Sequence, residues 1–140
     1  MANYVGYTRT NYFRVNDEQK FVSILSKCYT CEGEELEEMA INTDEGRKVG
    51  FYCEDSLLGY AENPEDTDYN LDAFYQDLQS LLPDDDAILI TEVGKEKMRY
   101  LVGRITVLTK NNIQCKSLDS LGKEMARKTL GEKWATINKC

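Results

Sequence analysis

The stretch LEEMAINTDEGRKVGFYC, residues 36–53, predicts a β-hairpin in the first half of the chain, and this hairpin is the clearest indication of the fold. Its first half is an extended segment with dispersed apolar residues, and its second half has Val49, Phe51 and Cys53 at alternate positions. Between the halves, Asp44-Glu45-Gly46 has the residue types that favour a tight turn. We therefore expect two strands that pair across this turn.

Amphipathic helices are predicted on both sides of this hairpin. Upstream, apolar residues at helical spacing predict a helix over residues 17–29, with Asn16 as its N-cap. Downstream, a second apolar stripe predicts a helix over residues 71–82, capped by Asp68 or Asn70. Each helix has one apolar face, so both are expected to pack against a sheet.

Further extended segments and a third helix complete the chain. The other predicted strands are residues 3–15, 87–90 and 98–109. Gly94-Lys95-Glu96 is predicted to turn between the last two, and a helix is expected over about residues 117–130, with Gly131 as its stop. Residues 54–70 are rich in Gly, Pro, Asn and acidic residues and predict a long acidic loop.

The order of these elements predicts a single α+β domain over residues 1–140. The first six follow the order β-α-β-β-α-β, which matches the ferredoxin-like split βαβ pattern, an antiparallel sheet with helices on one face. One more strand and one more helix are then added at the C-terminal end. The 140 residues are 41% apolar and 30% charged, a composition suited to one globular domain.

The sequence indicates a cytoplasmic protein that binds rather than catalyses. No apolar run approaches the roughly 18 residues of a membrane-spanning helix, and the opening residues lack a secretory signal. Five cysteines without dense spacing favour free thiols in a reducing cytosol. The chain contains no histidine, which excludes Ser-His-Asp and Cys-His catalysis and histidine-ligated zinc hydrolases. We expect no contact with a membrane.

Three patterns nevertheless resemble metal sites. Cys28 and Cys31 have the two-residue spacing of zinc knuckles but no second pair of that spacing. Asp66–Asp77 is close to a calcium-binding EF-hand loop but lacks its glycine and its final glutamate. Asp84–Glu92 with Lys95 is similar to the two acids and lysine of metal-dependent nucleases, although the lysine is one residue out of place. We expect no cofactor and keep a metal-dependent enzyme or calcium-binding module as the alternative.

Charge is divided unevenly along the chain, whose net charge is −8. Residues 1–31 carry 4 basic and 2 acidic residues, residues 32–86 carry 2 basic and 18 acidic, and residues 87–140 carry 11 basic and 5 acidic. The middle segment therefore has a net charge of −16, more than solubility requires. Such a surface is suited to the arginines and lysines of a groove that normally holds the phosphates of a nucleic acid. Direct binding of nucleic acid by the acidic face is disfavoured.

Three short segments resemble a group of small acidic proteins carried by conjugative elements and prophages of Gram-positive bacteria. They are YVGYTRTNYF (residues 4–13), LPDDD (residues 82–86) and EKMRY (residues 96–100). The resemblance implies a mobile-element protein in a host cytosol. Proteins of that size and acidity on such elements are often inhibitors of host defence, including anti-CRISPR and anti-restriction proteins. It implies no catalytic residues.

The leading hypothesis is an acidic binding protein that inhibits a host nucleic-acid-handling enzyme. The expected partner is a CRISPR effector, in particular the single-chain RNA-guided DNA endonuclease of type II systems. A plain accessory protein of the element is a further alternative, and the oligomeric state is left open. The residues expected to contact the partner are Glu34, Glu35, Glu37, Glu38, Glu65, Asp66, Asp68, Asp84, Asp85 and Asp86.

Overall fold

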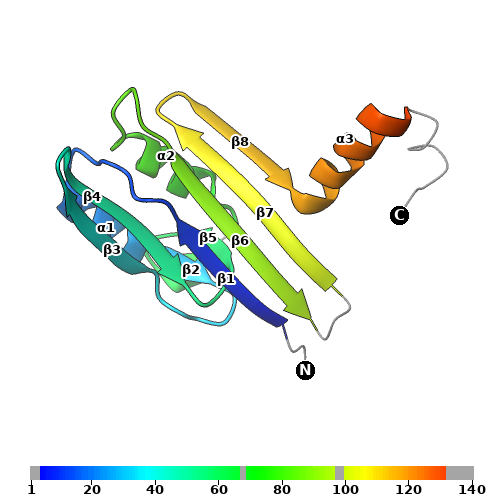
Figure 1. Ribbon diagram of the computed structural model, residues 1–140. Helices are drawn as coiled ribbons and strands as arrows, with labels where there is room; N and C mark the ends of the chain where they lie inside the picture. Colours follow the sequence, from blue (N-terminus) through cyan, green and yellow to red (C-terminus); the bar gives the residue numbers. More distant parts are fainter. Residues whose placement is uncertain (1–3, 67–68, 97–99, 132–140) are drawn as a thin grey trace.

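A six-stranded antiparallel sheet organises the protein (Figure 1). The computed structural model describes residues 4–66, 69–96 and 100–131. The strands are β1 (Tyr4–Thr10), β3 (Glu37–Thr43), β4 (Gly46–Cys53), β6 (Ile88–Glu96), β7 (Tyr100–Thr109) and β8 (Asn112–Ser117). They lie in the order β3-β4-β1-β6-β7-β8, so β3 and β8 are the two edges.

A second layer lies on one face of this sheet. It contains a two-stranded ribbon of β2 (Cys28–Thr30) and β5 (Leu57–Tyr60) and the helices α1 (Glu18–Ser26) and α2 (Asp72–Gln79). Figure 1 shows the ribbon and both helices behind the large sheet, while α3 (Leu118–Leu130) projects past the end of β8. A 3-10 turn, η1 (Pro64–Asp66), follows β5. Among the described residues, none of the helices combines the length and apolarity that crossing a membrane requires.

The hydrophobic core fills the space between the two layers. Alternate residues of the strands point into it, as Val49, Phe51 and Cys53 of β4 do. Phe13 and Phe21 meet edge to face at a centroid distance of 5.6 Å, which packs α1 against the chain that follows β1. The Phe74 ring of α2 lies against Phe51 at 5.9 Å in a similar geometry. Both helices therefore cover the same face of the sheet.

The predicted fold class, α+β, is confirmed. The predicted hairpin is β3–β4, and its register, with Thr43 opposite Gly46, is the one that a two-residue turn at Asp44 and Glu45 requires. The first six predicted elements are present in the predicted order, with an antiparallel sheet and both helices on one face. The closer assignment to the ferredoxin-like fold remains a prediction.

Several predicted boundaries are wrong. The first helix ends at Ser26, so Cys28 lies in β2, and its N-cap is Asp17, whose carboxylate accepts a hydrogen bond from the Lys20 N–H at 3.0 Å. The second helix begins at Asp72, and Asn70 still accepts a hydrogen bond from the Asp72 N–H at 2.8 Å. The alternative cap, Asp68, lies outside the described residues.

A predicted loop and a predicted turn contain strand residues. Residues 54–70 contain β5 and η1, and Gly94-Lys95-Glu96 is the last part of β6. Gly94 pairs with Gly6 of β1 on one side and Val102 of β7 on the other, so the strand pairing overrides the local preference of glycine for turns. Two strands, β7 and β8, are added after β6 where one was expected.

Candidate functional site

The loop from Cys31 to Leu36 carries three glutamates, Glu32, Glu34 and Glu35, and is anchored by hydrogen bonds. The Cys31 N–H donates to the Ser56 carbonyl at 3.1 Å. The Glu32 N–H donates to the buried Asp55 carboxylate at 2.7 Å, and the Thr30 hydroxyl donates to the Glu34 carbonyl at 2.7 Å. The loop therefore holds its glutamates on a defined backbone.

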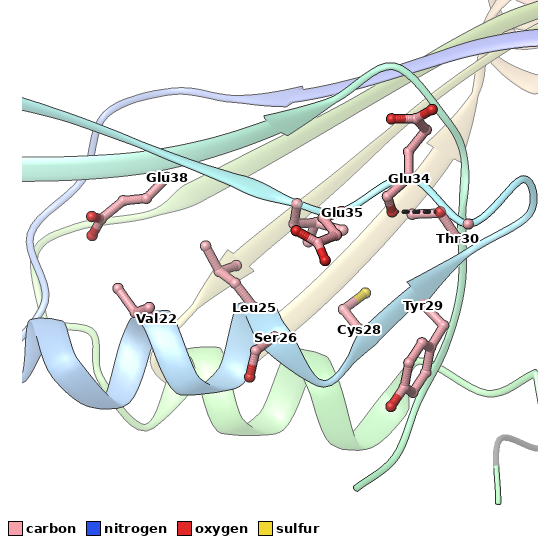
Figure 2. A pocket seen from close by; sticks show the side chains of 11 residues that line it. Val22, Leu25, Ser26, Cys28, Tyr29, Thr30, Glu34, Glu35 and Glu38 are labelled. Atoms are coloured by element: carbon pink, nitrogen blue, oxygen red, sulfur yellow. Dashed lines mark hydrogen bonds between the residues drawn. The ribbon is translucent and has the colours of Figure 1, made fainter. Parts of the chain in front are cut away.

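An apolar hollow of about 350 Å³ opens on the helix side of this loop, between α1 and the start of β3 (Figure 2). Its apolar lining comes mainly from Val22, Leu25 and Leu36. Glu34, Glu35 and Glu38 also line it, and Figure 2 shows the carboxylates of Glu35 and Glu38 on the side facing α1. An aliphatic wall is thus combined with negative charge.

An acidic hollow of about 540 Å³ opens on the other side of the same loop. The glutamates that line it are Glu34, Glu35, Glu37 and Glu54. The ring of Tyr52 lies among them and is partly exposed. This hollow is polar where the first is apolar, and the two share the residues from Gly33 to Glu35.

Strand alternation separates the two adjacent glutamates at the start of β3. In the β3–β4 register, Glu37 is opposite Tyr52 and Glu38 is opposite Phe51. Phe51 is fully buried in the core, so Glu38 lies on the helix side and Glu37 on the opposite side. Consecutive residues of β3 therefore serve different hollows, in agreement with the residues that line each one.

The electrostatics of the site reflect crowding of negative charge. Partial burial, and then the nearby charge of Glu18, raise the pKa of Glu38, although Arg47 acts in the other direction. A hydrogen bond to Glu37, and then the charge of that carboxylate, raise the pKa of the Tyr52 phenol. Within residues 4–66, 69–96 and 100–131, no lysine or arginine forms an ion pair with Glu34, Glu35, Glu37 or Glu38. The negative charge at this site therefore faces solvent.

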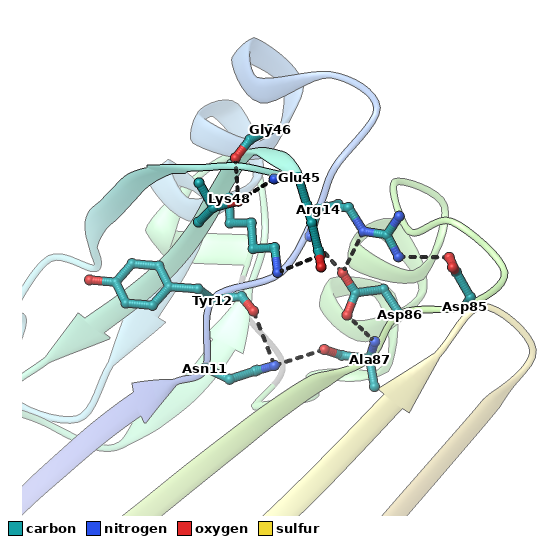
Figure 3. A network of polar contacts seen from close by, with 10 residues as sticks. Asn11, Tyr12, Arg14, Glu45, Gly46, Lys48, Asp85, Asp86 and Ala87 are labelled. Carbon is teal, nitrogen blue, oxygen red and sulfur yellow. Dashed lines mark hydrogen bonds and ion pairs between the residues drawn. The ribbon is translucent and has the colours of Figure 1, made fainter.

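The predicted contacts Asp84, Asp85 and Asp86 also form ion pairs within the protein, and Figure 3 shows Asp85 and Asp86 beside Arg14. Arg14 binds Asp85 at 2.7 Å and Asp86 at 3.3 Å, and Lys110 lies 3.5 Å from Asp84. Partial burial opposes ionisation of Asp86, but hydrogen bonds from the Arg14 and Ala87 N–H groups lower its pKa overall. Asp86 therefore anchors the turn that leads into β6, while the Asp84 and Asp85 side chains remain largely exposed.

The remaining predicted contacts lie apart from the two hollows. Glu65 and Asp66 are exposed on η1, and neither lines a hollow beside the Cys31–Leu36 loop. Asp68 lies outside the described residues. Of the nine predicted residues that the structure describes, Glu34, Glu35, Glu37 and Glu38 are therefore the ones that line the two hollows. Sequence reasoning missed Tyr52 and Glu54, although the predicted hairpin register would have placed Tyr52 opposite Glu37.

The described residues contain no group of three cysteine, aspartate or glutamate side chains placed to hold a metal ion. Cys28 is buried, which raises the pKa of its thiol far above the ordinary value, while Cys31 is exposed. Asp77, in the calcium-loop pattern, accepts a hydrogen bond from the Tyr60 hydroxyl at 2.6 Å. Glu92, in the nuclease pattern, is buried and paired with Arg104, and the three-residue offset puts Lys95 on the opposite face of β6.

Comparison of the chain with protein-family models, curated proteins and solved structures finds no match. The functional argument therefore rests on the geometry of this chain.

Proposed function

We propose that this protein is a non-enzymatic binding protein that presents the carboxylates of its Cys31–Leu36 loop and β3 to a basic groove on a partner protein. The observation that carries the proposal is the set of four glutamates, Glu34, Glu35, Glu37 and Glu38, on an anchored backbone without internal ion pairs among the described residues. Carboxylates held in this way form charge-assisted hydrogen bonds with arginine and lysine without first having to be ordered.

Several of the protein's own cations form ion pairs away from the four glutamates of this surface. Lys116 pairs with Glu124 and Lys123 with Asp119, both within the C-terminal third of the chain. Arg104 pairs with the buried Glu92. The ion pairs of the basic third are therefore with its own acids and with Asp84 rather than with the glutamates beside the hollows.

The proposed partner is a host enzyme that handles nucleic acid in the cytoplasm. The resemblance to acidic proteins of mobile elements favours a defence enzyme, in particular the single-chain RNA-guided DNA endonuclease of type II CRISPR systems. Such an enzyme holds its guide–target duplex in a positively charged channel. An acidic protein that occupies the channel competes with the phosphates, so inhibition results from binding alone.

A competition assay tests the proposal. The protein is titrated into the endonuclease bound to a fluorescent DNA target, at low and at high salt. We expect displacement of the DNA, weakened strongly by the fourfold reversal E34K/E35K/E37K/E38K. The double reversal E34K/E35K is compared with E45K/E62K, which changes the net charge equally at exposed glutamates that line neither hollow. Equal loss in both double variants would show that only net charge matters and would remove this surface from the proposal.

A further inference from the structure

The edge strand β3 offers a backbone on which a partner segment can be ordered. All seven of its residues pair with β4 on one side, and no strand of the described chain pairs with its other side. Six of the seven β3 residues are exposed, and the seventh, Met39, is half-buried. An edge strand leaves a row of N–H and C=O groups unpaired, and an extended peptide can add to it as a further strand.

A strand added to β3 would send its successive side chains to the two sides of the sheet, as β3 itself does. At the start of β3, one side leads to the apolar hollow of Leu25 and Glu38, and the other to the acidic hollow of Glu37 and Tyr52. Two consecutive residues of the added strand therefore reach different hollows. Residues two apart reach the same side.

The chemistry of each hollow suits a cationic side chain. In the apolar hollow, the aliphatic stem of an arginine or lysine can pack on Val22 and Leu25 while its charged end meets Glu38. In the acidic hollow, a guanidinium can bind Glu37 and Glu54 and lie against the Tyr52 ring. Both hollows therefore carry negative charge that complements the same kind of residue.

We propose that β3 and the two hollows form a recognition site for an extended partner segment with two consecutive basic residues, which pairs with the β3 edge and places one cation in each hollow. This inference rests on the proposed function and names the mode of recognition at the same surface. A second copy of this chain that pairs through its own β3 is a poor occupant, because Glu37–Thr43 contains no basic residue to place in either hollow.

Peptide binding to the full chain tests the inference. Two fluorescent hexapeptides of equal composition are compared by anisotropy: threonine-valine-arginine-arginine-valine-threonine, and threonine-arginine-valine-arginine-valine-threonine, in which the arginines are two apart. We expect the first to bind at least tenfold more tightly. Methylation of its backbone nitrogens on the edge that would pair with β3 should also weaken it at least tenfold, because the ladder hydrogen bonds are lost.

Single substitutions test whether each hollow contributes to peptide binding. E37Q and E38Q should each weaken binding of the consecutive-arginine peptide several-fold, while E45Q, on the turn after β3, should leave it unchanged. Equal affinity of the two peptides, no binding of either, or insensitivity to backbone methylation would overturn the inference. Light scattering measures whether the protein dimerises. Dimers that persist when the peptide is added in excess, although their formation requires a free β3 edge, would also overturn the inference. A different result would contradict the proposed function: E34K/E35K displaces DNA from the endonuclease as well as the wild type does.

Discussion

Removal of Arg104 should destabilise the protein more than removal of a cation whose acidic partner is exposed, because it leaves a buried carboxylate without its partner. The Glu92 side chain is only 6% exposed, while that of Arg104 is 42% exposed. The Arg104 Nε donates to Glu92 at 2.9 Å, and a second guanidinium nitrogen binds the same carboxylate oxygen. The Leu57 N–H of β5 is the remaining donor, at a long 3.4 Å. Glu92 thus links the large sheet to the β2–β5 ribbon, whose β2 strand directly precedes the Cys31–Leu36 loop.

The expected loss in the free energy of unfolding follows from the exposed fractions of these two side chains. Breaking a buried ion pair by removing one partner costs about 3–5 kcal/mol, and the partial exposure of Arg104 points to the lower end, about 3 kcal/mol for R104M. Replacing both partners, in E92M/R104M, should recover most of this loss because no charge is left buried. For the exposed pair of Lys116 and Glu124, the variant K116M should cost about 0–1 kcal/mol.

Urea unfolding followed by circular dichroism measures these differences. With a slope of about 2 kcal/mol per molar urea, R104M should shift the midpoint down by about 1.5 M. The double variant should lie close to the wild type, and K116M should be nearly unchanged. If R104M costs less than about 1 kcal/mol, or if the double variant is as unstable as R104M, the buried Glu92 does not depend on its partner and the reasoning fails.

Three other measurements follow from the structure. Folding lowers the pKa of Asp86, so the stability that its carboxylate contributes is fully present above the unfolded pKa of about 3.9 and is lost as pH falls through the folded pKa. The stability cost of D86N should therefore shrink below about pH 4, which unfolding curves measured at acid pH check. F74A should cost about 3–5 kcal/mol in thermal or urea unfolding, since Phe74 is fully buried between α2 and the sheet. Displacement of DNA from the endonuclease by this protein should weaken between about 50 and 200 mM salt, whereas a chelator should have no effect, which a titration in each buffer checks.

Much of the fold was accessible from local patterns. The hairpin of residues 36–53 could be predicted because its turn residues and the alternation of Val49, Phe51 and Cys53 agree with each other. Both packed helices could be placed by their apolar stripes, although the exact caps could not. At the first helix, Asn16 and Asp17 are both good caps, and only the backbone conformation at Asp17 decides between them.

The missed elements are those that depend on distant partners. Strands β2 and β5 have three and four residues, too few for periodicity to appear, and each is extended because the other pairs with it across the fold. Gly94 looked like a turn residue, but β1 and β7 pair with it from both sides. Short strands and interior glycines therefore take their conformation from neighbours that sequence spacing does not reveal.

The sequence by itself determined the α+β class, the hairpin and the acidity of the middle segment, because these depend on periodicity, turn chemistry and composition. Which carboxylates form ion pairs within the protein depends on the tertiary structure. Arg14, far from Asp85 and Asp86 in sequence, forms ion pairs with both, while no described lysine or arginine forms an ion pair with Glu37 or Glu38. Ion pairing and burial depend on distances in space, so residues of one type and one charge came to have different roles.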